Sequence, residues 1–260
     1  MPSVKVCVIR TAGTNCDKET AFAFTKAGAK SELVHINDFV QGNKNLADYQ
    51  ILALPGGFSY GDDIASGKVF ANELKCKLSA DLKKFVQDGK LIIGICNGFQ
   101  ILVKSGLLPG SDSFQQETSL IINDSGKFED RWIYLKSQKT QKCVWTKNLP
   151  EVIYLPVAHG EGKFIVKDKA VLNRLKKNNQ IVFKYCDAKG KPGDYPDNPN
   201  GSLEDIAGIC DSTGRVFGLM PHPERHIVSL QHPRWFNSKN KAGDGLMIFK
   251  NGVEYAKKLL

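Results

Sequence analysis

Apolar and polar positions alternate in blocks along the first half of the chain. Continuous apolar runs predict four strands, at residues 4–10, 30–36, 50–55 and 90–96. Amphipathic runs with helical spacing predict three helices, at residues 16–29, 72–89 and 99–108. Short buried strands that alternate with helices are typical of a parallel sheet covered on both faces. The pattern therefore predicts an α/β fold with a mostly parallel central sheet flanked by helices.

The pattern changes near residue 110, where short β-branched and aromatic runs replace the alternation. These runs predict antiparallel or mixed additions to the sheet, at residues 118–124, 131–138, 142–147 and 152–160. Residues 206–211 and 215–224 predict a hairpin joined by "STG", and a final helix is expected at about 243–258.

One stretch of the second half, residues 187–202, is rich in Pro, Gly, Asn and Asp, which predicts a loop. The sequence contains no repeat and no segment typical of an interdomain linker. We therefore expect a single domain over residues 1–260 with a loop insertion near 187–202.

Composition places the chain among ordinary globular proteins, with 42% hydrophobic and 24% charged residues. It has no apolar stretch of about 18 residues, and its first residues predict a strand rather than a signal peptide, so we expect no membrane association. The seven cysteines lack paired spacing, which favours free thiols in a reducing compartment and hence a cytoplasmic protein. No CxxC pattern offers a metal site, and we expect none.

The net charge of +9 raises the alternatives of a nucleic-acid, membrane or acidic protein partner. The lysines are spread along helix-like segments such as "DLKKFVQDGK" and "NRLKKNNQ", and no basic block is interleaved with aromatic residues. We therefore expect no nucleic-acid partner, whereas docking to an acidic protein surface stays open.

The clearest chemical signal is "GICNG", in which Cys96 lies between two glycines where a strand turns into a helix. A nucleophile at such a turn sits in strained backbone, and the positive end of the following helix favours its thiolate. The alternative is a small buried hydrophobic residue, which is the role expected of Cys7, Cys76, Cys143, Cys186 and Cys210. Cys16, in "GTNCDKET", is a weaker candidate for a reactive thiol.

A cysteine nucleophile needs a base, and "MPHPER" offers His222 with Glu224 two residues further on. Pro223 predicts extended backbone here, which would point His222 and Glu224 to the same side. The alternative is a surface turn that happens to contain both residues. His159, followed by Glu161 in "AHGEGKF", is the rival base, although its glycine neighbours favour a pocket wall.

An oxyanion needs two donors. The N–H of Asn97, next to the nucleophile, is one candidate, and the N–H of Gly57 in "LPGGFSYGDD" is the other. The glycine-rich loop could instead cradle a bound anion, but it lacks the spacing of a phosphate-binding loop.

Together these motifs resemble the class I glutamine amidotransferases, whose triad is Cys, His and Glu in that order along the chain. The similarity is closest to the family of glutaminase subunits of phosphoribosylformylglycinamidine synthase. It rests on "GTNCDKET", "LPGGFSYGDD", "GICNGFQIL", "AHGEGKF", "NPNGSLEDIAGICD" and "GLMPHPER". The resemblance implies a flavodoxin-like amidotransferase fold and a type 1 amidotransferase domain over residues 1–260.

What the resemblance implies chemically is hydrolysis of L-glutamine to glutamate and ammonia through a thioester on Cys96, with His222 and Glu224 completing the triad. It assigns Gly57 and Asn97 to the oxyanion hole. The residues that it assigns to glutamine binding are Phe58, Gln100, His159, Gly160 and Glu161.

The resemblance also implies partners. Ammonia would pass to a separate synthetase subunit that uses ATP and Mg²⁺, with a small accessory subunit, while this chain carries no cofactor. Three rivals remain open at this point: the glutaminase of a different amidotransferase complex, a non-hydrolytic binding or stress protein with a cysteine elbow, and an idle scaffold within a complex.

Overall fold

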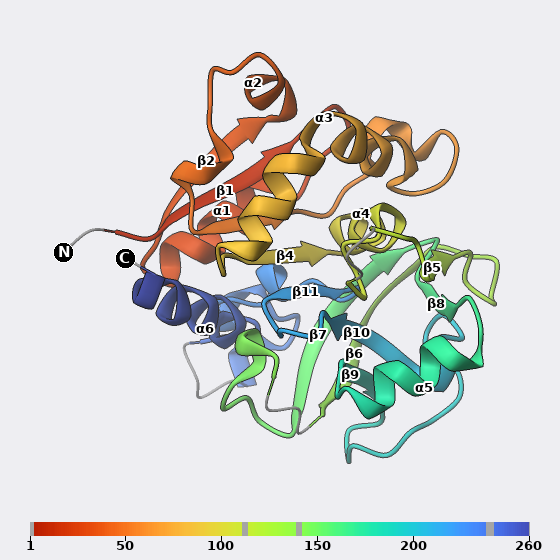
Figure 1. The fold of residues 1–260 in the computed structure, drawn as a ribbon. Coiled ribbons are helices and arrows are strands. Elements are labelled where there is room, and N and C mark those ends of the chain that lie inside the picture. The colour runs from red at the N-terminus through yellow and green to blue at the C-terminus, as the bar shows by residue number, and fades with distance from the viewer. Residues whose placement is uncertain (1–2, 111–113, 139–141, 238–241, 260) are drawn as a thin grey trace.

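A nine-stranded sheet runs through the middle of the structure, a computed structural model that describes residues 3–110, 114–138, 142–237 and 242–259 (Figure 1). In spatial order its strands are β2 (Lys30–His35), β1 (Lys5–Arg10), β3 (Ile51–Leu54), β4 (Leu91–Ile95), β11 (Val216–Leu219), β10 (Ile206–Cys210), β9 (Ile181–Cys186), β6 (Glu129–Ser137) and β7 (Val152–His159). Neighbouring strands are parallel from β2 to β11 and antiparallel from β11 to β7. A separate antiparallel pair joins β5 (Thr118–Ile121) to β8 (Lys163–Val166).

Helices flank the sheet. They are α1 (Asp17–Lys26), α2 (Ile36–Val40), α3 (Lys68–Gln87), α4 (Asn97–Ser105), α5 (Lys169–Lys177) and α6 (Leu246–Ala256). The chain moves outward one way from β1 to β2 and the other way from β3 to β4, so right-handed crossovers place α1 and α3 on opposite faces. α6 packs against α1 through Phe24 and Phe249, whose ring centroids lie 4.9 Å apart.

The predicted fold class is confirmed, because the sheet is parallel in its first half, flanked by helices and extended by antiparallel strands. Every residue of β3, β4, β10 and β11 is buried, which explains their continuous apolar sequences. The predicted hairpin of β10 and β11 is present, and residues 187–202 form no helix or strand.

One predicted strand is wrong. Residues 142–147 were expected to pair, but Val144–Thr146 form a short 3-10 helix. Trp145 at its centre is fully buried, its Nε1–H donates to Arg215 O (2.9 Å), and its ring lies against Gly252 of α6. Trp145 is therefore aromatic because it packs in the core against α6, and not because it belongs to a strand.

Three further elements, α2, β8 and β9, were not predicted, and α5 was anticipated only as the helix-like segment "NRLKKNNQ". The start of α5 carries a recognisable signal, since Asp168 Oδ1 accepts a hydrogen bond from the Val171 N–H (2.9 Å) as a helix cap.

The carboxyl ends of β1, β3, β4 and β11 meet at one edge of the sheet because these four strands are parallel neighbours. Such an edge is where open α/β sheets bind ligands. The register pairs Leu219 of β11 with Ile95 of β4, so the segments that follow these two residues begin side by side.

Candidate active site

Cys96 occupies the sharp turn between β4 and α4. Its backbone has φ 52° and ψ −107°, a conformation that costs a non-glycine residue roughly 1–3 kcal/mol. The Cys96 N–H donates to Leu219 O (2.8 Å), which ties the turn to β11. The side chain is only 5% exposed, and Sγ lies 3.6 Å from Ala158 O. A buried cysteine in strained backbone at a strand-to-helix turn is the arrangement of a nucleophile elbow.

The two glycines around Cys96 are required by close backbone packing. A Cβ on Gly98 would lie 1.9 Å from the Leu54 carbonyl oxygen at the end of β3, and one on Gly94 would lie 2.5 Å from Gly98 O. A side chain at Gly98 would push the elbow away from β3, and one at Gly94 would push α4 away from β4. The sequence pattern therefore reports how tightly the turn is packed between two strands.

His222 follows β11 and lies beside the elbow. Its Nδ1 is 2.6 Å from Glu224 Oε1, and both side chains are buried, with exposed fractions of 2% and 0%. The His222 N–H donates to Pro156 O of β7 (2.8 Å), so backbone contacts fix the residue as well. Its Nε2 is buried and has no hydrogen-bond partner among the described residues. The imidazole thus presents one nitrogen to the carboxylate and leaves the other available.

The contact between His222 and Glu224 was predicted, but the backbone reason given for it is wrong. Pro223–Arg225 form a turn of 3-10 helix instead of continuing as extended chain. Pro223 occupies the first position of that turn, where its fixed φ and missing N–H are tolerated. The turn carries Glu224 back to His222, and the extended-chain argument is not needed.

The electrostatic setting favours a protonated His222. Burial alone would lower the pKa of His222, but the Glu224 carboxylate and the Cys96 and Cys16 side chains raise it well above its usual range. The Glu224 carboxylate is therefore paired with an imidazolium, which compensates for burying the charge.

Replacing Glu224 with glutamine should remove this pH-dependent stabilisation. Because the pKa of His222 is raised by folding, the pair stabilises the folded state fully below pH 6.5, the ordinary value, and less as the pH rises through the folded value. We expect Glu224→Gln to lower the free energy of unfolding by about 2 kcal/mol at low pH and by less at high pH.

Urea unfolding of both proteins across this pH range measures the effect. Glu254→Gln is the matched control, since Glu254 is exposed and, within the described ranges, pairs only with Lys257. A difference between wild type and Glu224→Gln that stays constant with pH would contradict the assigned imidazolium–carboxylate pair.

Cys16 and Gly56 complete the wall around the imidazole. A Cβ on Gly56 would lie 2.8 Å from His222 Cε1, 3.2 Å from Cys16 Sγ and 3.5 Å from Cys96 Cβ. At Gly56 the loop after β3 therefore packs closely against Cys16 of the loop after β1 and against the triad candidates His222 and Cys96. Cys16 Sγ accepts a hydrogen bond from Arg225 Nη2 (3.1 Å), and burial raises the pKa of its thiol.

Cys16, His222 and Glu224 also form the one group in the described ranges with ligand types suited to a metal ion, their ligand atoms lying within 4.8 Å of one another. Two features oppose that use. His222 Nδ1 and the Glu224 carboxylate already bond each other, and the Arg225 guanidinium brings a positive charge to the Cys16 sulfur. These contacts fit a thiol packed against the imidazole of His222 better than a metal centre.

Gly57 follows β3, and Asn97 follows Cys96 at the start of α4. Gly57 has φ +143°, and a Cβ there would lie 2.8 Å from Asn15 N and from Gly13 O, so only glycine fits. Neither the Gly57 N–H nor the Asn97 N–H has a hydrogen-bond acceptor within the described part of the chain. Two free N–H groups beside a nucleophile are the donors that an oxyanion hole needs.

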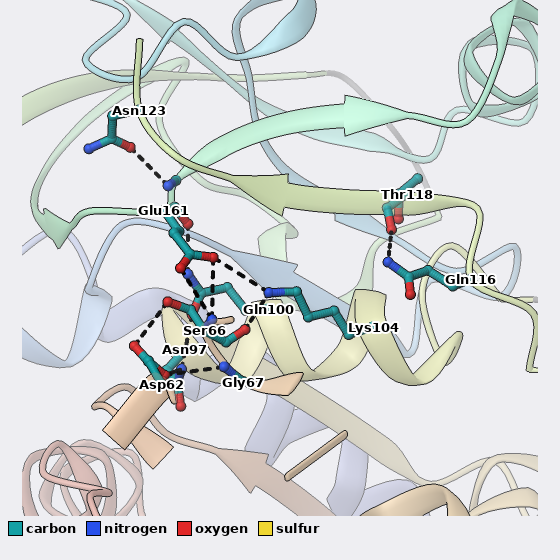
Figure 2. A network of polar contacts seen from close by, with 11 residues as sticks. Asp62, Ser66, Gly67, Asn97, Gln100, Lys104, Gln116, Thr118, Asn123 and Glu161 are labelled. Atoms are coloured by element: carbon teal, nitrogen blue, oxygen red, sulfur yellow. Dashed lines mark hydrogen bonds and ion pairs between the residues drawn. The ribbon is translucent and has the colours of Figure 1, made fainter. Parts of the chain in front are cut away.

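The side chains of Asn97 and Gln100 are both engaged in bonds within the protein. Asn97 Oδ1 accepts from the Ser59 N–H (3.2 Å), and its amide nitrogen donates to Gln100 Oε1 (3.0 Å). Gln100 Nε2 in turn donates to Glu161 O (2.6 Å). Gln100 therefore connects α4 to the loop after β7, and Glu161 joins the polar network of Figure 2.

Phe58, in the loop after β3, and Gly160, in the loop after β7, both lie near Phe128. The Phe58 side chain is 47% exposed and stacks on Phe128, with ring centroids 6.3 Å apart. The only atom near a Cβ on Gly160 would be Phe128 Cδ2, at 3.8 Å. An exposed aromatic pair that includes the residue after Gly57 can form the apolar side of a substrate entrance.

His159 has no nitrogen free to act as a base. Its Nδ1 lies 3.2 Å from Asn123 Oδ1, and its Nε2 lies 3.4 Å from the Asn200 amide. Burial and the neighbouring His222 lower its pKa to about 3, so the ring is neutral. The geometry favours the pocket-wall alternative over the rival-base alternative.

Comparisons with known proteins agree with the geometry of the site. The sequence profile of the CobB/CobQ-like glutamine amidotransferase domain matches residues 3–256. A relative from Methanococcus maripaludis, named phosphoribosylformylglycinamidine synthase subunit PurQ, is 49% identical over 98% of this chain and 98% of its own. A relative of the same name from Dehalococcoides mccartyi is 49% identical over 100% of both chains. The chain belongs to the PurQ family of glutamine amidotransferases. The resemblance drawn from the motifs is confirmed, and with it the expectation of an amidotransferase.

The fold of this PurQ family member is also similar to the folds of solved structures. A chain in a structure of PurLQS from Thermotoga maritima is 33% identical, has a TM-score of 0.76, and is matched over 98% of this chain and 99% of its own. A glutamine amidotransferase from the same organism, 15% identical with a TM-score of 0.52 over 100% of this chain and 94% of its own, shares the fold.

The other cysteines of this amidotransferase follow the prediction with one exception. Cys7, Cys143, Cys186 and Cys210 are buried, as expected of small hydrophobic residues, whereas Cys76 is exposed. Cys76 lies on the solvent side of α3, where the helical pattern leaves it outside the core. Its expected burial is therefore wrong.

Sequence reasoning about this PurQ family member missed Gly56 and Arg225. Both lie inside motifs that were recognised, so the signal was their position next to Gly57 and Glu224. None of the helices in the described part of the chain has the length and apolar character that crossing a membrane requires.

Proposed function

We propose that this chain is the glutamine-hydrolysing subunit of a phosphoribosylformylglycinamidine synthase and supplies ammonia for de novo purine synthesis. The observation that carries the proposal is the strained Cys96 elbow beside the buried His222–Glu224 pair. The relatives that bear this name are similar along the entire chain, which supports the choice of complex.

The reaction begins with attack of the Cys96 thiolate on the side-chain amide of glutamine. The N–H groups of Gly57 and Asn97 stabilise the oxyanion of the tetrahedral intermediate. His222 gives the proton at Nε2 to the departing ammonia, while Glu224 holds Nδ1 and keeps the ring oriented. Water then attacks the thioester, with His222 taking its proton, and glutamate leaves. The sum is glutamine plus water giving glutamate plus ammonia.

The glutamine pocket is formed by the loop after β3 and the loop after β7. Phe58 and Gly160 provide its apolar side, and Gln100 and Glu161 join the elbow helix to the loop. His159, neutral and bonded at both nitrogens, forms part of the wall. These contacts support the assignment of the five residues to glutamine binding.

The ammonia is delivered to a synthetase subunit that uses ATP and Mg²⁺, in a complex with a small accessory subunit, in the cytoplasm. This chain itself carries no cofactor and forms one amidotransferase domain over residues 1–260. The similar chain from the Thermotoga maritima PurLQS structure supports a multi-subunit assembly.

Glutamate release from glutamine, with and without the synthetase and accessory subunits from the same source, tests the proposal. We expect hydrolysis to appear or rise when the partners are added with ATP, Mg²⁺ and formylglycinamide ribonucleotide. Formation of the amidine product from glutamine should then require this chain, whereas ammonium salts should replace it. A complex that forms the product equally well from glutamine without this chain would contradict the assignment.

A further inference from the structure

A buried lysine lies directly behind the glutamine-binding residues. Lys104, on α4, is 6% exposed, and its Nζ donates to Ser66 O (2.5 Å). The same Nζ lies 3.6 Å from Glu161 Oε2. One ammonium group therefore joins three segments: the elbow helix, the loop before α3 and the loop after β7 (Figure 2).

Glu161 is held by this network at both its side chain and its backbone. Both oxygens of its carboxylate accept from the Ser66 N–H (3.3 Å each), and its carbonyl accepts from Gln100 Nε2 (2.6 Å). Asp62 adds a second carboxylate nearby, which accepts from Ser66 Oγ (2.9 Å) and from the Asn97 amide (3.3 Å). Lys104 pairs with Glu161, and its charge also acts on Asp62.

Burying an ammonium group is costly unless it is paired and hydrogen-bonded. Burial lowers the pKa of Lys104, and Glu161 and Asp62 oppose that shift. A methionine of similar length would fill the space without a desolvation cost. Packing alone therefore does not explain a charged residue at this position. The group that the charge holds most directly is the Glu161 carboxylate.

We propose that Lys104 is a positioning residue for glutamine, holding the loop of Glu161 against Gln100 so that the pocket is formed before the substrate arrives. The inference rests on the proposed glutaminase function. Within the described residues Lys104 has no hydrogen bond or ion pair with Cys96, His222 or Glu224, so it acts on the pocket and not on the chemistry. Preorganised pockets avoid the ordering cost at binding.

Lys104→Met, assayed in the complex with the synthetase subunit, tests this role. We expect KM for glutamine to rise about tenfold while kcat changes by less than about twofold, because ground-state binding is lost and the triad is untouched. Lys104→Arg keeps the charge and should recover much of the affinity. Lys75→Met is the matched control, since Lys75 is exposed and, among the residues that the structure describes, donates only to a backbone carbonyl.

Labelling of Cys96 separates the pocket from the nucleophile. A glutamine-like diazoketone should label Lys104→Met about tenfold more slowly than wild type at limiting concentration, whereas iodoacetamide should alkylate Cys96 equally fast in both. Glu161→Gln should reproduce the pattern from the other side of the ion pair if Lys104→Met does not fold.

The outcomes are distinct. Equal diazoketone labelling of wild type and variant, or a fall in kcat with KM unchanged, overturns the role of Lys104 alone. Slower iodoacetamide labelling in step with slower diazoketone labelling overturns it too, since the elbow itself would then be disturbed. A wild-type complex that the diazoketone does not label overturns the proposed glutaminase function.

Discussion

Cys96→Ala should reduce glutamine hydrolysis by at least about 10⁴-fold, because Cys96 is the residue proposed to form the thioester and removal of a catalytic nucleophile has effects of this size or larger. The thiol is held by strained backbone at the sheet edge, with the imidazole of His222 beside it. The alanine side chain fits the same backbone, so the protein should fold and still bind glutamine. Glutamate release by the complex at saturating glutamine measures the loss.

Cys76→Ser provides the control for this experiment, because Cys76 is the exposed thiol on α3. Its replacement should leave glutamate release within about twofold of wild type. Cys16→Ser tests whether Cys16 is the nucleophile instead, since Cys16 lies against His222 and donates to Asn15 Oδ1 (3.2 Å). Full activity in Cys96→Ala, or its loss only in Cys16→Ser, would move the nucleophile to Cys16.

Gly98→Ala should destabilise the protein by at least about 3 kcal/mol, even though alanine is the better helix former by about 1 kcal/mol. The added methyl group would lie 1.9 Å from Leu54 O, a backbone atom in a fully buried strand. Neither partner can move without separating α4 from β3. We expect a lower midpoint of urea unfolding and loss of glutaminase activity, because the shift displaces the elbow from Gly57.

Gly160→Ala is the matched control for stability, since the nearest atom to its added methyl group lies 3.8 Å away. The change in its free energy of unfolding should stay within about 1 kcal/mol. If the Gly98→Ala protein were as stable as the Gly160→Ala protein, the close contact between the elbow and β3 would be contradicted.

The parts of the site that could be predicted are those encoded by neighbouring residues. Gly94, Cys96 and Gly98 lie within one turn, and their spacing reflects backbone contacts that leave no room for side chains. His222 and Glu224 are likewise close in sequence, so their contact followed from the motif although the backbone between them was expected to be extended.

The parts that could not be predicted depend on residues far apart in the chain. Lys104 looks like one more surface lysine in the sequence, and its burial follows only from contacts with Ser66 and Glu161. Trp145 has the aromatic character of a strand residue, but its partners Arg215 and Gly252 come much later in the chain. No local pattern encodes such contacts, because they arise when the sheet brings the segments together.

The pairing of β4 with β11 has a consequence for how such an enzyme can vary. Leu219 and Ile95 are partners in the ladder, so the proposed nucleophile and base, which follow them, are spaced by main-chain hydrogen bonds in the centre of the sheet. Their separation is insensitive to surface substitutions and to loop length elsewhere. Differences in substrate affinity or in response to a docked subunit must therefore arise in the loops after β1, β3 and β7, which can change while the reacting pair stays in place.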